Sequence, residues 1–256
     1  MSLDIAGLNV RFGARTVVDV DTLSVADAEI VGLAGESGSG KSMTTLAVLG
    51  LANTVGATVT GSIKLDGREL IGLPDKVLAT VRGSQIAAIF QSPSMAFNPV
   101  FRVGHVAVRA LRQHGLTSSE AAERMAQAMR EVLLSPDLLH RYPSQLSGGQ
   151  LQRVAIALAV ALHAEVLLAD EPTSALDVTV QAEVLELIRE LRDRDGMSVL
   201  FISHDLAVVA ELCDRVAVMQ AGSIVEQGPV DQIMSAPRHP YTADLLRSVP
   251  SIARQG

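Results

Sequence analysis

The sequence is poor in cysteine and in aromatic residues. It has one cysteine, no tryptophan and only 3% aromatic residues. The single cysteine, Cys213, cannot form an internal disulfide, which favours a reducing compartment, and its apolar neighbours predict a buried core residue rather than a reactive thiol. A mean hydropathy of +0.31 with so few aromatic residues reflects many alanines, valines and leucines. These residues fit either a large aliphatic core or a partly apolar docking surface.

Long apolar segments are absent too. The longest apolar run, residues 154–162, is far shorter than the ~20 residues that a helix needs to cross a bilayer. Residues 1–10 alternate apolar and polar side chains and lack the basic start and apolar block of a signal peptide. We therefore expect a protein that is not exported and that reaches a membrane only peripherally, through a partner.

An excess of basic charge is also missing. The 256 residues carry a net charge of −7, and the isoelectric point is near 5.4. Proteins that bind nucleic acid need a basic surface, so broad electrostatic binding to DNA or RNA is disfavoured, although a local basic patch is compatible with these numbers. Hydrophobic residues make up 48% of the chain, which excludes a disordered protein and allows one large domain or two small ones.

The hydrophobic pattern predicts an α/β fold. Short alternating segments up to residue 31, broken at Gly13 and near Asp27, indicate an antiparallel sheet. Asp66 and Gly67 predict a hairpin turn, and residues 86–90 a buried strand. Further segments alternate between strand and helix, which indicates a mostly parallel sheet covered on both faces; they are the predicted helix 43–51, strand 165–169, helix 178–191, strand 198–202, helix 206–212 and strand 215–220.

The middle of the chain has a different pattern. Residues 103–134 have helical spacing, and we expect a helix over residues 120–133 that is capped by Ser118 and Ser119. This block predicts a helical insert. The tail after Pro237 contains two more prolines and is expected to lie on the surface.

A glycine-rich loop follows the predicted buried strand at residues 30–34. It fits the pattern G-x-x-x-x-G-K-[ST] with Gly35, Glu36, Ser37, Gly38, Ser39, Gly40, Lys41 and Ser42. The glycines let successive backbone N–H groups turn towards one anion, and a helix that starts near Lys41 directs the positive end of its dipole to the same place. The loop therefore predicts nucleotide binding, with Lys41 on the β- and γ-phosphates and Ser42 on Mg²⁺. The alternative is a glycine-rich turn without a ligand.

Two further patterns carry chemistry. The strand at residues 165–169 leads into Asp170, placed for the Mg²⁺ shell, and Glu171, placed to orient or deprotonate a water molecule. A second turn precedes a helix predicted over residues 151–162, and it consists of Leu146, Ser147, Gly148, Gly149 and Gln150. Taken alone, such a turn is an ordinary helix cap, and an apolar strand ending in two carboxylates occurs in many α/β proteins. Their order after the phosphate loop is more specific.

With these motifs in this order, the chain resembles the ATP-binding cassette (ABC) ATPases over nearly its whole length. The resemblance implies a P-loop NTPase (RecA-like) core with an N-terminal antiparallel β subdomain and an inserted α-helical subdomain. Residues 1–91 and 155–235 would form the core and the β subdomain, residues 92–154 the helical subdomain, and residues 236–256 a C-terminal tail. The cofactors that it implies are ATP and Mg²⁺.

The resemblance also assigns roles to single residues. Gln91 matches the Q-loop glutamine, which contacts Mg²⁺; residues 146–150 match the signature motif, which binds the ATP of a partner subunit; His204 matches the switch histidine on the γ-phosphate. Glu171 would be the catalytic base. Phe12 stands where the family stacks an aromatic ring on adenine, although tyrosine is usual there and a core role fits as well. The set is completed by Met43 beside the phosphate loop and by the D-loop residues Ser174, Ala175, Leu176 and Asp177.

Physical reasoning supports a shared site. Transfer of a γ-phosphoryl group needs positive field on both sides, which the loop supplies on one side and residues 147–149 can supply on the other. One monomer of this size is not expected to present both to the same nucleotide. The resemblance therefore implies a head-to-tail pair of identical or related cassettes, which closes on ATP and opens after hydrolysis.

Two stretches resemble the peptide and nickel importer cassettes in particular. They are residues 90–99 around Gln91 and residues 236–246 near the C-terminus. Many oligopeptide cassettes continue with a cysteine-containing extension, whereas this sequence ends at Gly256 and has only Cys213, so a nickel or metallophore cargo stays as open as a peptide cargo. The other histidines (105, 114, 140, 163 and 239) show no ligand-like spacing, and we expect no metal there.

The sequence thus predicts the ATP-hydrolysing subunit of an ABC importer on the cytoplasmic face of the membrane. Its expected partners are a second ABC ATPase subunit, two integral-membrane permease subunits and, indirectly, an extracytoplasmic substrate-binding protein. The alternative is a soluble ABC-type ATPase acting on nucleic acid or ribosomes. The acidic balance and the lack of sustained heptads between Lys41 and Leu146 disfavour that alternative.

Overall fold

The computed structural model describes residues 1–91, 97–174 and 176–248. These residues form two compact units. The first unit consists of residues 1–73 together with those from Ser198 onward, and the second unit of residues 74–197.

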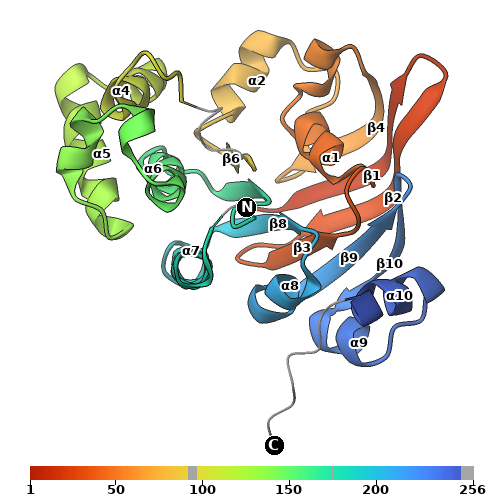
Figure 1. Cartoon of the computed structure of the whole chain (residues 1–256). Helices are drawn as coiled ribbons and strands as arrows, with labels where there is room; N and C mark the ends of the chain where they lie inside the picture. Colours follow the sequence, from red (N-terminus) through yellow and green to blue (C-terminus); the bar gives the residue numbers. More distant parts are fainter. Residues whose placement is uncertain (92–96, 175, 249–256) are drawn as a thin grey trace, which may run out of the picture. The chain divides into compact units, whose positions relative to one another are not determined.

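An antiparallel sheet opens the first unit. Its strands are β1 (Leu3–Phe12), β2 (Arg15–Val25), β4 (Thr58–Leu65) and β5 (Arg68–Glu69), in the order β2-β1-β4-β5 (Figure 1). The hairpin between β4 and β5 turns at Asp66 and Gly67, which both have positive φ angles of 49° and 77°. Two such residues form the turn that matches the twist of a hairpin, so the predicted turn is confirmed.

A second sheet in the first unit is mostly parallel. Its strands β3 (Ile30–Ala34), β8 (Ser198–Ser203), β9 (Arg215–Gln220) and β10 (Ser223–Pro229) lie in the order β10-β9-β3-β8, and only β10 runs antiparallel to its neighbour. Every residue of β3 and β8 is buried, as expected for central parallel strands. The helices of this unit are α1 (Lys41–Val48), η1 (Ala52–Val55), α8 (Leu206–Leu212), α9 (Val230–Ser235) and α10 (Pro240–Ser248).

Close packing joins α8 to β3. A side chain at Gly32 would have its Cβ only 2.6 Å from Val209 Cγ1 and 3.1 Å from the sulfur of Cys213. Cys213 is buried, which confirms the prediction of a core residue, and burial next to Asp214 raises the pKa of its thiol. This thiol therefore stays protonated and inert.

The second unit combines two parallel strands with a group of helices. Strands β6 (Ile86–Ile89) and β7 (Val166–Asp170) pair in parallel. The helices are α2 (Asp75–Val81), α4 (Val103–Gln113), α5 (Ser118–Glu131), η2 (Pro136–His140), η3 (Pro143–Gln145), α6 (Gly148–Ala161) and α7 (Val178–Asp195). Helix α5 packs against α4 and α6 through small and flexible side chains such as Ala121, Met125 and Met129, which are all buried (Figure 1).

Several sequence predictions need correction. The cap of α5 is Thr117 rather than Ser118 or Ser119, because Thr117 and Glu120 form a reciprocal capping box. Helix α6 begins at Gly148, three residues before the predicted start. The segment after Pro237 was expected to lie on the surface, and residues 238–248 are mostly exposed or half-buried, but residues 240–248 form helix α10, in which Thr242 is fully buried. Proline at the first helical position costs no hydrogen bond, so Pro240 starts this helix instead of preventing it.

Candidate functional site

The phosphate loop, residues 35–42, connects β3 to α1 in the first unit. Two of its glycines are required by close backbone contacts at positive φ. A Cβ on Gly35 (φ 153°) would lie 2.2 Å from the carbonyl oxygen of Met219, and a Cβ on Gly40 (φ 113°) would lie 2.9 Å from the carbonyl oxygen of Val17. Only glycine fits at these two positions, so the surrounding strands fix the path of the loop.

Lys41 occupies the interior of this loop. Its side chain is 5% exposed, and its ammonium group donates to the carbonyl oxygens of Gly35 (2.7 Å) and Glu36 (2.8 Å). The hydroxyl of Ser39 lies 3.4 Å from the same ammonium group. The loop thus holds a fixed positive charge at its centre, as phosphate binding requires.

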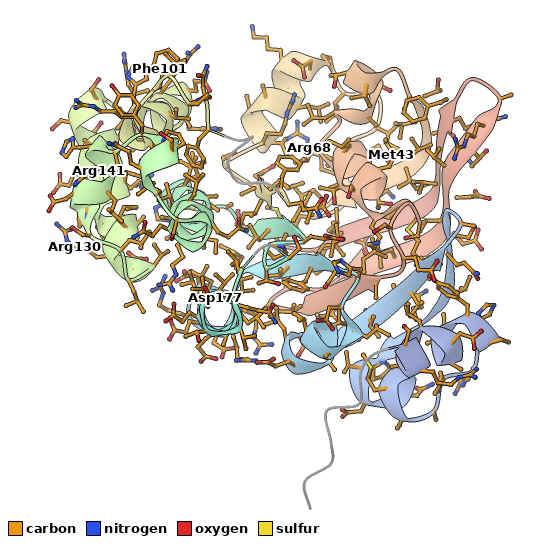
Figure 2. All side chains as sticks on the ribbon, in the orientation of Figure 1. Met43, Arg68, Phe101, Arg130, Arg141 and Asp177 are labelled. Atoms are coloured by element: carbon orange, nitrogen blue, oxygen red, sulfur yellow. The ribbon has the colours of Figure 1, made fainter. Side chains whose placement is uncertain are left out.

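The start of α1 is open to a ligand. No side chain caps this helix at Gly40, whereas α6 and α7 both have side-chain caps. The first N–H groups of a helix without a cap are free to bind an anion. The remaining residues of the predicted nucleotide-binding set surround this point; Glu36, Ser37, Gly38 and Ser42 are exposed, and Met43 is half-buried on α1 (Figure 2).

His204 lies at the same sheet edge as the phosphate loop. Strands β3 and β8 are parallel, and Ala34 pairs with Ser203, so Gly35 and His204 both follow directly at the carboxyl ends of neighbouring strands. The imidazole is exposed. Phe12, in contrast, is a half-buried residue at the hairpin end of β1, where it pairs with Arg15.

Glu171 and Gln91 meet in the second unit. Strands β6 and β7 are parallel, and Ile89 pairs with Ala169, so both residues emerge from the same edge. The side-chain nitrogen of Gln91 donates to Glu171 Oε2 at 2.7 Å. Asp170 precedes this contact as the last residue of β7, and it is only 4% exposed. The structure therefore brings together three residues that the sequence assigned to one reaction.

Glu171 has an unusual backbone conformation. Its φ angle is 48°, in the left-handed region that residues with a side chain rarely adopt. Its carbonyl oxygen accepts a hydrogen bond from the hydroxyl of Ser174 at 3.2 Å and another from the backbone N–H of the same residue at 3.3 Å. The turn that follows β7 is thus fixed by the first residue of the D-loop.

The signature motif and the D-loop pack against each other. Ser147 caps α6 by accepting from the N–H of Gln150 at 3.2 Å, while the Gln150 side chain accepts from the N–H of Ser147 at 3.0 Å. Asp177 caps α7 by accepting from the N–H of Val180 at 3.0 Å (Figure 2). A Cβ on Gly149 would lie 2.3 Å from Val180 Cγ1. The two helix starts therefore touch, and glycine allows the close approach.

The remaining members of these motifs complete the surface. Ser147 and Gly148 are exposed, and a Cβ on Gly148 would make an ordinary 3.7 Å contact with Leu176. Leu146 is half-buried just before the cap. Ala175 of the D-loop and residues 92–96 of the importer-like stretch lie outside the described residues.

The structure also shows a loop contact that sequence reasoning missed. The N–H of Glu36 donates to the hydroxyl of Tyr241, on α10, at 3.1 Å. In addition, the N–H of Gly222, in the turn between β9 and β10, donates to the carbonyl oxygen of Ser39 at 2.9 Å. No motif spacing signals these contacts, because they join segments that are far apart in the sequence, 205 positions for Glu36 and Tyr241.

Two regions of the chain match known protein families. Residues 18–174 match the family described as ABC transporter, and residues 225–256 match the region described as Oligopeptide/dipeptide transporter, C-terminal region. The dipeptide transport ATP-binding protein DppD of Haemophilus influenzae is 43% identical over 98% of this chain and 78% of its own length. The protein of the same name from Escherichia coli is 41% identical over 98% of this chain and 79% of its own length.

Solved structures agree with this assignment. The cbiO1 protein of Clostridium perfringens, part of the ABC transporter complex cbiONQ, is 25% identical with a TM-score of 0.79 and covers 91% of this chain and 90% of its own. A dimeric ATP-binding cassette in a post-hydrolysis state, bound to ADP and Pi, has a TM-score of 0.77 at 25% identity and covers 89% of this chain and 98% of its own. The predicted P-loop NTPase fold is therefore confirmed. The chain belongs to the ABC transporter family and is an ATPase.

Proposed function

We propose that this chain is the ATP-hydrolysing subunit of an ABC importer that takes up dipeptides or oligopeptides. The observation that carries the cargo class is the match of residues 225–256 to the oligopeptide/dipeptide transporter C-terminal region. Two relatives above 40% identity over nearly the whole chain are named dipeptide transport ATP-binding proteins. These findings favour a peptide cargo over the nickel or metallophore cargo that the sequence left open.

The phosphate loop supplies the nucleotide grip in this proposal. The buried ammonium group of Lys41 and the N–H groups at the uncapped start of α1 neutralise the phosphates of ATP. Phe12 is proposed to stack on the adenine ring. His204 contacts the γ-phosphate from the neighbouring strand end.

The oxygen donors of three predicted ligands suit Mg²⁺, which prefers hard oxygen atoms. They are the Ser42 hydroxyl, the Asp170 carboxylate and the side-chain oxygen of Gln91. Because the Gln91 nitrogen already donates to Glu171, the amide oxygen is the atom that this residue can offer a cation. When bound, Mg²⁺ would neutralise charge on the phosphate oxygens.

Glu171 is the proposed general base. Its carboxylate accepts from Gln91, and its backbone is held by Ser174, so the side chain has a defined direction before any ligand binds. A positioned carboxylate can orient the attacking water molecule and take its proton. Replacement of this carboxylate is therefore expected to stop ATP hydrolysis while ATP binding is retained.

The signature motif is proposed to act on the nucleotide of a second subunit. Ser147 and Gly148 are exposed at the start of α6, where N–H groups and the helix dipole favour an anion. Each nucleotide would lie between the phosphate loop of one subunit and the signature motif of the other, and Asp177 would link the two subunits. The second subunit is identical or related, and the ATP-bound pair opens after hydrolysis.

The membrane partners complete the proposal. No helix in residues 1–91, 97–174 and 176–248 is long and apolar enough to cross a bilayer. We assign transport to two separate permease subunits that hold this chain on the cytoplasmic face of the membrane, with an extracytoplasmic binding protein delivering the cargo. In this arrangement residues 92–154 are the helical subdomain, and residues 1–91 with 155–235 are the core and β subdomain.

The test is co-purification followed by transport. The chain would be co-expressed with the permease and binding-protein genes that neighbour its own gene, and the complex reconstituted in proteoliposomes. We expect ATP-dependent uptake of a labelled dipeptide, and no uptake when Lys41→Ala replaces the wild-type chain. ATP-dependent uptake of nickel without uptake of peptide would overturn the cargo, and failure of permeases to co-purify would overturn the importer assignment.

A further inference from the structure

Tyr241 holds the first peptide of the phosphate loop. Its hydroxyl accepts from the N–H of Glu36 at 3.1 Å. The carbonyl oxygen of the same residue accepts from the ammonium group of Lys41 at 2.8 Å. Both backbone polar groups of Glu36 are therefore engaged, one by the lysine inside the loop and one by a tyrosine on α10.

The start of α10 is itself firmly attached. The carboxylate of Glu226, on β10, accepts from the N–H groups of Arg238 (2.7 Å) and His239 (3.0 Å). The N–H of Tyr241 donates to the His239 ring nitrogen Nδ1 at 3.2 Å, which fixes the first turn of the helix. Thr242, the next residue, is fully buried. The tyrosine is thus held in place by its neighbours on β10 and α10.

The ionisation of Glu226 supports this anchor. Burial raises the pKa of this carboxyl, but the hydrogen bonds that it accepts from the backbone N–H groups of Arg238 and His239 outweigh burial and lower its pKa below the ordinary value. The carboxylate therefore stays charged at neutral pH and keeps its two backbone donors.

The hairpin of β9 and β10 also contacts the phosphate loop directly. Strand β9 contributes the Met219 carbonyl oxygen that lies against Gly35, and the β9–β10 turn contributes the N–H of Gly222 that donates to Ser39. Because β10 also anchors the start of α10 through Glu226, the hairpin and the helix hold the phosphate loop from two sides.

We propose that Tyr241 is a positioning residue that keeps the phosphate loop in its nucleotide-binding shape. The hydroxyl restrains the Glu36 peptide, so part of the ordering of the loop is already present before ATP arrives. The inference rests on the proposed role of this loop as the ATP site. Its effect is on affinity for nucleotide rather than on the chemical step, because the hydroxyl of Tyr241 bonds to a backbone N–H of the loop and not to a proposed catalytic side chain.

The chain offers a matched pair of variants, because its only two tyrosines are Tyr142 and Tyr241. Tyr241→Phe removes the hydroxyl at the loop, and Tyr142→Phe removes the same hydroxyl from the second unit. Loss of one hydrogen bond predicts that Tyr241→Phe binds Mg-ATP about two- to tenfold more weakly and raises KM with kcat little changed. The Tyr142→Phe variant should match the wild type in both measurements.

Intrinsic fluorescence provides a second readout, because the sequence has no tryptophan. In the Tyr142→Phe chain, Tyr241 is the only tyrosine, and its emission should stay nearly constant as Mg-ATP saturates the loop, because its hydrogen bond to Glu36 is already formed without nucleotide. A large change of this emission at saturation, or a Tyr241→Phe chain that binds Mg-ATP as tightly as the wild type, would overturn the inference alone. A wild-type chain that binds no Mg-ATP would overturn the proposed site as well.

A double-mutant cycle tests whether Glu226 acts on the phosphate loop through Tyr241. Glu226→Ala frees the start of α10, so it should weaken Mg-ATP binding by a factor similar to that of Tyr241→Phe. The double variant should be no weaker than the stronger single variant, because both changes remove one restraint. If the losses of Mg-ATP affinity add fully, Glu226 acts independently of Tyr241, and its proposed effect through Tyr241 is wrong.

Discussion

The side-chain nitrogen of Gln91 donates a 2.7 Å hydrogen bond to the carboxylate of Glu171. The two residues leave neighbouring parallel strands at the same edge, so the contact needs no long or flexible connection. A glutamine that gives its nitrogen to the proposed base keeps its oxygen for a cation. The Gln91 side chain thereby contacts the proposed base with its nitrogen and offers its oxygen to the proposed cation.

Replacement of the proposed base should stop hydrolysis and spare binding. Glu171→Gln keeps the length of the side chain and an oxygen that can accept from Gln91, but it removes the group that takes a proton. We expect the ATPase rate to fall by about 100-fold or more, with affinity for ATP retained. Phosphate release and size-exclusion chromatography with ATP should show an inactive chain that accumulates as a closed dimer. Near-normal turnover would contradict the assignment.

A large, positively charged side chain at the signature motif should stop ATP hydrolysis and leave ATP binding intact. Ser147 is exposed and caps α6, so Ser147→Arg is expected to leave ATP binding by the monomer largely intact while it blocks dimer closure and hydrolysis. Ser147→Thr keeps a capping hydroxyl and serves as the control for loss of the cap. Unaltered hydrolysis in Ser147→Arg would argue against a shared site.

The glycine pair after Ser147 predicts a sharp difference between adjacent positions. A Cβ on Gly149 would overlap Val180, so Gly149→Ala should lower the free energy of unfolding by about 1–3 kcal/mol. Gly148→Ala meets only an ordinary 3.7 Å contact and should leave stability nearly unchanged. Chemical denaturation of both variants measures the difference. If the overlap is the cause, Val180→Ala added to Gly149→Ala should restore much of the loss.

Acid stability should depend on Glu69. Burial would raise its pKa, but hydrogen bonds from the Ser62 hydroxyl and from the N–H groups of Ile63, Ile71 and Leu70 outweigh it and lower the pKa below the ordinary 4.5. The carboxylate therefore contributes stability that is complete above that value and is lost as the pH falls through the lower folded-state pKa. Thermal unfolding across this range should show a large difference between wild type and Glu69→Gln at neutral pH that narrows in acid. Parallel curves at all pH values would contradict the role of this carboxylate.

Local patterns predicted much of the fold. Helix α8 and strand β9 have the predicted bounds, because each is a short, strongly apolar segment, and Asp205 caps the helix. The phosphate loop and the Ser147 cap were equally readable, since both are fixed by residues a few positions apart. Thr117 also carried a readable signal, the spacing of a capping box to Glu120, which the prediction of Ser118 and Ser119 passed over.

Contacts between distant segments were beyond local patterns. Gln91 and Glu171 are 80 positions apart, and Glu36 and Tyr241 are 205 positions apart. Such pairs depend on strand order and register, which spacing along the chain does not encode. The packing of Gly149 against Val180 depends likewise on how the helices α6 and α7 meet in the fold. Sequence reasoning thus proposed the residues of the site, and the fold determines which of them touch.

The left-handed backbone conformation of Glu171 lowers the stability of the fold at the residue that is proposed to act as the base. A side chain in this conformation costs about 1 kcal/mol or more, and glycine would avoid that cost. Laboratory evolution that selects this protein only for heat resistance should therefore enrich Glu171→Gly and lose the ATPase. An active thermostable variant of this enzyme therefore needs stabilising substitutions at other positions, because the proposed catalytic base is also a residue with a strained backbone.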